Sequence, residues 1–296
     1  MEKKPRRWLT IAVLGASSLM FIGLSMVPLI GGILNPPSNP SAKSTASPTA
    51  TASDSPETIK KEEEGYQLVL KRDPNNQTAL QGLVESRLKL LQAGQRKPKD
   101  LIEPLTQLAK LNPEQPMYAT LLAQAQQQSG DMVAAAQTYL NILTQKPTQM
   151  EPLQGYVSLL IQQQRSAEAF DLLQSTIATA KQMNLQQAGS ADLPAIELLL
   201  GDVYLSQKRD SEAIALYERL QKESPNDFRP VVAKGIVLRN QGKNQDALTL
   251  FKSAESLAPV DVKSKIQQLI ASISPKTPTP SATSSGSPVP KSSPSP

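Results

Sequence analysis

The sequence predicts an all-α protein: a solenoid of stacked helical hairpins, preceded by one N-terminal transmembrane helix. The first observation is a proline that recurs at a fixed interval, since Pro113 and Pro147 lie 34 residues apart, as do Pro225 and Pro259. The second is that small and aromatic residues recur in register with this proline, which is typical of repeat proteins. The third is an uncharged apolar run at residues 8–34 that is long enough to cross a bilayer.

The N-terminal segment is predicted to be a membrane anchor. Residues 8–34 carry no charge, and about 20 residues of helix already cross the hydrocarbon core. Four basic residues lie within residues 1–7, and the next basic residue after the apolar run is Lys43. The positive-inside rule then places residues 1–7 in the cytoplasm and the rest of the chain on the periplasmic or lumenal side of the membrane.

The alternative is a cleaved signal peptide, which would release the rest of the chain as a secreted protein. A signal peptide has the same charged start, but its apolar core usually spans about 7–15 residues and ends at a cleavage site of small residues. Here the apolar run is longer, and the Ala-Thr-Ala motif at residues 50–52 lies well beyond its end. The uncleaved anchor is therefore the prediction, and secretion after cleavage stays open as the alternative.

Composition separates a folding region from two flanking segments. Residues 35–53 and 274–296 consist almost entirely of Pro, Ser, Thr, Ala, Asn and Lys, so both are predicted to be disordered. Residues 54–273 remain to form the solenoid. The net charge of the whole chain is +5, but the cations outside residues 54–273 account for it, and this region is close to neutral. It offers no electrostatic attraction for a phosphate backbone, so nucleic acid is not an expected partner.

The chain contains no cysteine and no histidine. This excludes disulfides, thiol nucleophiles, Ser–His and Cys–His pairs, and metal sites that need imidazole or thiolate. The acidic run Glu62, Glu63 and Glu64 is interpreted as a solvated helix face rather than a cation site. Glu197 and Asp202 lie on different faces of one predicted helix, so they do not form a catalytic carboxylate pair. The sequence predicts a protein that is not an enzyme and needs no cofactor and no metal.

Each repeat unit is predicted to contain two antiparallel helices. In the fourth unit the helices are expected at residues 194–207 and 210–223. Gly201 and Ala213 are expected where the two helices cross closely, with the ring of Tyr217 filling the space beside them. Similar residues recur at the same places in the other units. The predicted units are residues 75–113, 114–147, 148–191, 192–225 and 226–259.

Two of these units are longer than the 34-residue period. Residues 75–113 have their extra residues near Gly94–Lys99. Residues 148–191 add ten, which are expected to lengthen the second helix past Met183 to a break at Gly189–Ser190.

Two further helices are predicted to flank the units. Residues 56–72 form a leading helix, with Ser55 as its N-cap and Pro56 at the first helical position. Residues 260–273 form a closing helix that covers the exposed core of the last unit. Its apolar face is Val262, Ile266, Leu269 and Ile273.

This pattern resembles the tetratricopeptide repeat. Residues 199–204 (Leu-Leu-Gly-Asp-Val-Tyr), followed by Ala213, Tyr217 and Pro225, match that family's Leu-Gly-x-x-Tyr, its Ala-x-x-x-Phe and its closing proline. Two other units match in the same way, through Ala135, Tyr139 and Pro147 and through Ala247, Phe251 and Pro259. The aromatic residue with which the family begins its first helix is absent. The resemblance covers roughly residues 75–259 and implies a solenoid that binds other proteins.

In the resembled fold, the first helices of successive units line a concave groove. The resemblance implies that a protein segment, helical or extended, binds there. One subgroup of the family clamps C-terminal carboxylates with Lys, Asn and Arg, but here only Arg239 and Asn240 have suitable chemistry, so that ligand is disfavoured. The candidate binding residues are Thr120, Gln124, Gln127, Gln154, Ser158, Gln162, Leu198, Asp202, Leu205, Val232, Ile236 and Arg239.

Together these observations predict a membrane-tethered scaffold or adaptor that binds membrane-associated proteins and assists their assembly or organisation. The linker at residues 35–53 would span about 25 Å on average, so the solenoid could search a zone near the membrane. One alternative is a structural oligomer or envelope component that binds no guest in its groove. Another is a carboxylate-dependent enzyme.

Overall fold

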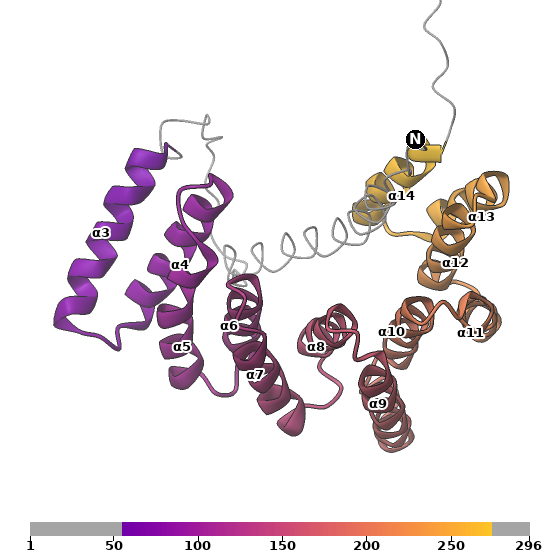
Figure 1. Cartoon of the computed structure of the whole chain (residues 1–296), viewed down its shortest axis with the longest axis horizontal. Coiled ribbons are helices and arrows are strands. Elements are labelled where there is room, and N and C mark those ends of the chain that lie inside the picture. The colour runs from indigo at the N-terminus through magenta and orange to yellow at the C-terminus, as the bar shows by residue number, and fades with distance from the viewer. Residues whose placement is uncertain (1–54, 274–296) are drawn as a thin grey trace, which may run out of the picture. The chain divides into compact units, whose positions relative to one another are not determined.

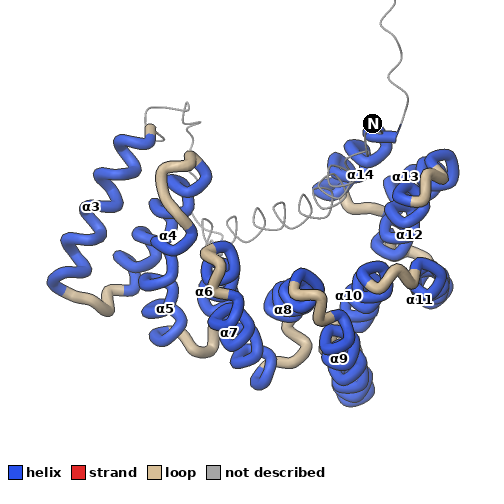
Figure 2. Tube along the Cα trace, in the orientation of Figure 1, coloured by secondary structure: helices blue, strands red, loops and turns tan. Residues whose placement is uncertain are grey.

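The computed structural model describes residues 55–273, and all regular secondary structure in that range is helical (Figure 1 and Figure 2). Twelve α-helices and one short 3-10 helix, η1, follow one another along this part of the chain. The all-α prediction is therefore confirmed for these residues. The elements are α3 (Pro56–Arg72), α4 (Gln77–Gln92), η1 (Pro98–Leu101), α5 (Ile102–Leu111), α6 (Pro116–Gln128), α7 (Met132–Gln145), α8 (Met150–Gln162), α9 (Ser166–Gln186), α10 (Leu193–Ser206), α11 (Asp210–Glu223), α12 (Phe228–Asn240), α13 (Asn244–Leu257) and α14 (Val260–Ile273).

The helices pair into hairpins. Each predicted unit contains two α-helices, and α3 and α14 occupy the predicted leading and closing positions. In the fourth unit α10 begins and ends one residue earlier than predicted, while α11 has the predicted bounds. Every helix contacts the next one along the chain, from α3 to α14. This succession of stacked hairpins is the solenoid fold that the proline period predicts.

Side-chain caps begin several of the helices. The hydroxyl of Ser55 accepts a hydrogen bond from the backbone N–H of Thr58 at 3.3 Å, which confirms Ser55 as the N-cap of α3. Asp131 and Asp192 accept from the backbone N–H groups three residues ahead, at 3.0 and 3.1 Å. These bonds satisfy donors that the first turn of a helix leaves without a partner, so the bounds are encoded locally.

A residue with positive φ turns the chain between the two helices of all five units, and in the first unit it is Gly94 (φ 71°). Gly130 (φ 90°) and Gly242 (φ 78°) occupy this place in two of them, where glycine adopts the left-handed conformation without strain from a Cβ atom. Gln164 (φ 61°) and Lys208 (φ 60°) occupy it in the other two. A side chain in this conformation costs about 1 kcal/mol, so these two turns carry local strain.

Within two units, a glycine of the first helix lies directly against an aromatic ring of the second. A Cβ atom placed on Gly201 would lie 2.3 Å from Oη of Tyr217, and one placed on Gly235 would lie 2.6 Å from Cε1 of Phe251. Both rings are buried. The predicted close crossing at Gly201 is therefore confirmed.

The same glycine–aromatic contact also joins one unit to the next. Gly155 of α8 lies against Tyr139 of α7, which belongs to the preceding unit. Gly82 of α4 lies in the same way against Tyr66 of α3. By this contact, α3 behaves as the second helix of a unit that precedes α4.

Both insertions lie where the sequence predicts them. The extra residues of the first unit form the turn after α4 and the helix η1, and those of the third unit extend α9 to 21 residues. Asn184 then holds the following loop, since its amide Nδ2 donates to the Ala191 carbonyl and its Oδ1 accepts from the Ala191 N–H, both at 2.9 Å.

The closing helix α14 covers the last part of the core, as predicted. Ile266 is buried in a cluster with Phe251, Ala254 and other residues of α12 and α13. Val262, Leu269 and Ile273 are partly buried against the same cluster.

Within residues 55–273, no helix is both long enough and apolar enough to cross a membrane. The predicted cytoplasmic start at residues 1–7, the predicted transmembrane segment 8–34, and the predicted disordered segments 35–53 and 274–296 lie outside the described residues.

Candidate functional site

The twelve candidate binding residues lie on four helices, α6, α8, α10 and α12, and we call them the first-helix face. These helices are the first helices of four successive units, and a second helix separates each from the next along the chain. In space they are neighbours, because α6 contacts α8 and α8 contacts α10. Leu198 and Leu205 of α10 pack in one cluster with Val237 of α12. Packing between units therefore brings these helices next to one another.

On α6 and α8 the first-helix face is polar. Gln127 Nε2 donates a hydrogen bond to Gln162 Oε1 at 3.0 Å, so two candidates 35 residues apart in sequence meet directly. Gln154 is exposed, and Ser158 and Gln124 are partly buried. The carbonyl Oε1 of Gln124 is itself buried and has no hydrogen-bond partner among the described residues.

The prediction for Thr120 is corrected by the structure. Its side chain is only 1% exposed, and its hydroxyl donates to the backbone carbonyl of Pro116 at 2.8 Å. Thr120 has the helical phase of a surface residue, but the neighbouring helices close over it. It therefore belongs to the packing between helices and not to an accessible binding surface.

On α10 and α12 the first-helix face is mainly apolar. Leu198, Leu205, Val232 and Ile236 are partly buried against the hydrophobic clusters, and Arg239 is also partly buried. These four aliphatic side chains therefore contribute to the core and keep part of their surface available.

Asp202 lies on α10 between Leu198 and Leu205. Its side chain is exposed to solvent, yet protein atoms crowd around it. The resulting loss of hydration raises the pKa of Asp202 to about 6, because burial disfavours a charged carboxylate. Burial raises the pKa of Tyr217 well above its ordinary value of 10.0, and the negative charge of Asp202 raises it further.

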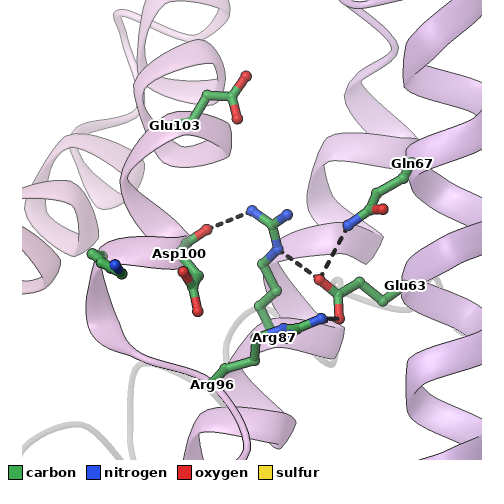
Figure 3. Close-up of a pocket in the computed structure, with 7 residues that line it drawn as sticks. Glu63, Gln67, Arg87, Arg96, Asp100 and Glu103 are labelled. Carbon is green, nitrogen blue, oxygen red and sulfur yellow. Dashed lines mark hydrogen bonds and ion pairs between the residues drawn. The ribbon is translucent and has the colours of Figure 1, made fainter.

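A second polar site involves Glu63 of α3. It corrects the interpretation of residues 62–64 as a solvated face for Glu63 alone, since Glu62 and Glu64 are exposed. Glu63 is only 2% exposed. Figure 3 shows its carboxylate enclosed by side chains from α3, α4 and the loop after α4. Oε1 accepts hydrogen bonds from Arg87 Nε at 2.9 Å and from Gln67 Nε2 at 3.2 Å, and Oε2 accepts from Arg96 Nη2 at 2.7 Å.

These contacts determine the ionisation of Glu63. Burial alone would raise its pKa, but the hydrogen bonds from Arg96 and Arg87 outweigh burial, so the pKa lies below its ordinary value of 4.5. Arg87 also donates to the backbone carbonyl of Asp100 in η1. The hydrogen bonds of Glu63 and Arg87 thus connect α3 to the first unit and to its inserted loop.

The cavity beside Glu63 has a volume of about 330 Å³ and a lining with as many acidic as basic side chains. Both oxygens of Glu63 are already occupied by cationic donors, so the carboxylate is not available as a general base or as a metal ligand. The cavity lining is Glu63, Gln67, Arg87, Arg96, Lys99, Asp100 and Glu103.

Another cavity, of about 500 Å³, lies among α9, α10 and α11. Its lining includes the apolar Ile177 and Leu216 and the buried Glu197, whose Oε1 accepts from Arg219 Nη2 at 3.1 Å. Glu197 points to α11 in this way, whereas Asp202 has no such contact. The structure therefore places these two carboxylates apart, as predicted. No group of three or more acidic side chains within residues 55–273 is arranged to hold a metal ion.

Comparison with known proteins places this geometry in context. A family profile described as "Tetratricopeptide repeat" matches residues 83–258, which is more than half of the chain. The protein SLOW GREEN 1, chloroplastic, of Arabidopsis thaliana is 34% identical over 64 residues, which cover 22% of this chain and 20% of that relative. The match thus spans about a fifth of the relative's length.

Several solved structures share the helical-repeat arrangement at low identity. TTC0263, a thermophilic TPR protein of Thermus thermophilus, is 16% identical with a TM-score of 0.43, over 66% of this chain and 98% of that chain. Yeast Tom70 is 15% identical with a TM-score of 0.49, over 71% of this chain and 42% of that chain. Likenesses at this level carry no information about a partner.

Proposed function

Since the chain belongs to the tetratricopeptide repeat family, whose fold is typically a non-catalytic scaffold for protein interactions, we propose that it is a membrane-tethered adaptor. It binds a segment of a partner protein on the first-helix face and assists the assembly or organisation of membrane or envelope proteins. It has no catalytic site and needs no cofactor.

One observation carries the binding part of the proposal: the packing gathers side chains from four separate units on one face and leaves several of them without an internal role. Gln154 and Asp202 are exposed on neighbouring helices, and no hydrogen bond or ion pair to either side chain is present within residues 55–273.

The tether rests on the sequence of residues 1–53. An uncharged run at residues 8–34 follows a basic start, which favours a single-pass anchor with residues 1–7 in the cytoplasm. The repeat domain then works on the periplasmic or lumenal side. A flexible linker of the composition of residues 35–53 keeps it close to the bilayer and raises its effective concentration toward membrane-embedded partners.

Partner capture tests the binding part. The full chain and the triple variant Gln124→Ala, Gln154→Ala, Asp202→Ala are crosslinked in the membrane, purified and compared by mass spectrometry. A matched control replaces Gln137, Asn141 and Asp171, which lie on the second helices α7 and α9 and are exposed. Proteins lost with the first variant and retained by the control support the adaptor. Equal recovery from all three chains, with unchanged helicity, contradicts it.

Cysteine labelling tests the tether. Because the chain has no cysteine, a single Ser129→Cys or Lys3→Cys substitution can be labelled with a membrane-impermeant maleimide without background. In sealed vesicles with the periplasmic or lumenal side outward, position 129 should be labelled and position 3 protected. Release of the labelled domain by alkaline carbonate would instead indicate cleavage and secretion.

A structural oligomer is the second candidate, and one observation favours it. Both ends of the described stack expose large apolar side chains, Leu68 and Val69 on α3 and Leu257 and Val260 near α14. Such end surfaces suit head-to-tail association between copies. A mass that rises with concentration in analytical ultracentrifugation, and returns to that of a monomer in Leu68→Glu, supports the oligomer. A strict monomer excludes it.

A further inference from the structure

Asp202 differs from the other acidic side chains of α10 and α11. Glu197 is held by Arg219, Glu212 by Arg209, and Glu218 by Lys234. Within residues 55–273, no hydrogen bond and no ion pair reaches the Asp202 carboxylate. Arg239, the one cation on the first-helix face, forms no ion pair with it either. Asp202 is thus a charge without a counter-charge.

Asp202 has a leucine on each side along the same face of α10. Leu198 lies one helical turn before it and Leu205 about one turn after it, on the same face of α10. Leu198 packs both against the central cluster that contains Tyr156 of α8 and against the cluster of Tyr217 and Val237. Asp202 is therefore flanked on α10 by aliphatic side chains that keep part of their surface free.

The described part of the protein leaves the charge of this carboxylate uncompensated. No hydrogen-bond donor among residues 55–273 reaches the carboxylate, and the partly buried Leu198 and Leu205 give it apolar neighbours. A negative charge in such a place is stabilised when a ligand supplies a cation. A divalent metal is a poor candidate, because no further acidic groups gather around Asp202 within the described residues.

We infer that Asp202 anchors a lysine or arginine side chain of the polypeptide bound to the first-helix face. The ammonium or guanidinium group would contact the carboxylate, while Leu198 and Leu205 would contact the apolar stem of the same side chain. This inference rests on the proposed function and narrows it, since it specifies a partner segment that carries a basic residue among apolar ones.

The test uses a random 12-residue peptide library displayed on phage, selected against the full chain in lipid nanodiscs. The same selection is run on Asp202→Asn and Asp202→Lys, and on the matched controls Asp171→Asn and Asp171→Lys. Asp171 is an exposed aspartate on the second helix α9. Circular dichroism verifies that all variants retain their helicity.

The inference expects peptides rich in lysine or arginine from the wild-type chain and from both Asp171 controls. A selected peptide should bind Asp202→Asn about tenfold more weakly, the loss of one charge-assisted contact, and Asp202→Lys should select acidic peptides instead. Selected peptides without basic residues, or with equal affinity for Asp202→Asn, overturn the inference.

Failure of the proposed function gives a different result. If no peptide is selected, or if selected peptides bind unchanged when Gln154→Arg and Ser158→Arg obstruct the neighbouring surface of α8, the first-helix face is not the binding surface. Both proposals are then rejected. Peptides that are blocked by the α8 substitutions but carry no basic residue reject only the anchor at Asp202.

Discussion

Replacement of Gly201 by alanine should destabilise the solenoid, although the same change normally stabilises a helix. Alanine in a helix interior is favoured over glycine by about 1 kcal/mol. At Gly201, however, the new Cβ atom would lie 2.3 Å from Oη and 2.4 Å from Cε1 of Tyr217. Ordinary carbon contacts are about 3.5–4.0 Å, so the ring or the helix must move by more than about 1 Å.

The magnitude follows from the burial of the ring. Tyr217 is 1% exposed, so it has no free space into which it can turn. Overpacking of this kind costs about 1–3 kcal/mol, which outweighs the gain in helix propensity. We expect a net loss of about 1 kcal/mol in the free energy of unfolding.

Gly65→Ala is the matched control. Gly65 lies in α3, is exposed, and would place no heavy atom within 4 Å of a new Cβ. This variant should gain about 0.5–1 kcal/mol, so the two substitutions should differ by about 2 kcal/mol.

The assay is urea unfolding of the full chain in mild detergent, followed by circular dichroism at 222 nm. Because repeat proteins can unfold in parts, hydrogen exchange resolved by helix accompanies it. A cycle with Tyr217→Leu isolates the contact, since Gly201→Ala should become neutral or stabilising once the ring is gone. If Gly201→Ala stabilises the wild-type chain as Gly65→Ala does, the close crossing is wrong.

Four further predictions follow from single side chains. Tyr139→Phe should stabilise the chain by about 1 kcal/mol in the same urea assay, because the buried hydroxyl has no hydrogen-bond partner among the described residues; a loss of stability would reveal such a partner. Glu63→Gln should cost about 2 kcal/mol and speed hydrogen exchange in α3, with the effect of Glu63 present above pH 4.5 and lost as the pH falls through its lowered pKa; a pH-independent cost would contradict the ion cluster. Asp202→Asn should raise the melting temperature above pH 6 and have no effect below pH 3.8, since a raised pKa means that stability is lost as the carboxylate ionises; an equal rise at both pH values would refute the desolvated charge. Lys208→Gly should stabilise by about 0.5 kcal/mol because it relieves a φ of 60°; destabilisation would show that the side chain has a role in the turn.

Features encoded by neighbouring residues could be predicted from the sequence. The capping hydroxyl of Ser55, and the proline that follows four of the five second helices, set helix bounds through contacts only a few residues long. The fourth unit was therefore placed to within one residue. Gly201 and Tyr217 were paired correctly because a 16-residue spacing recurs in register with the prolines.

Features that depend on contacts between distant segments could not be predicted. Glu63 accepts hydrogen bonds from Arg87 of α4 and from Arg96 of the following loop, which lie 24 and 33 residues away in sequence. In the sequence, the lysines and glutamates next to Glu63 indicate a solvated face. One signal was present, since Glu63 follows the buried Ile59 by four residues and so shares its side of α3.

In the candidate site, too, local features could be predicted and contacts between distant segments could not. The resemblance to the repeat family placed both Thr120 and Asp202 on the first-helix face, but packing buries Thr120 and leaves Asp202 exposed. Whether a charge has a partner also depends on all the helices around it. The sequence could therefore place Asp202 on α10 but could not show that it lacks a counter-charge.

The most direct test of the central claim is photo-crosslinking of the full chain in its native membrane. A benzoylphenylalanine replaces Gln154 on the first-helix face, and in a second chain it replaces Val133, which is 81% exposed on the second helix α7. The account predicts a discrete crosslinked partner from position 154 and none from position 133. A partner captured from position 133 and absent from position 154 would contradict it.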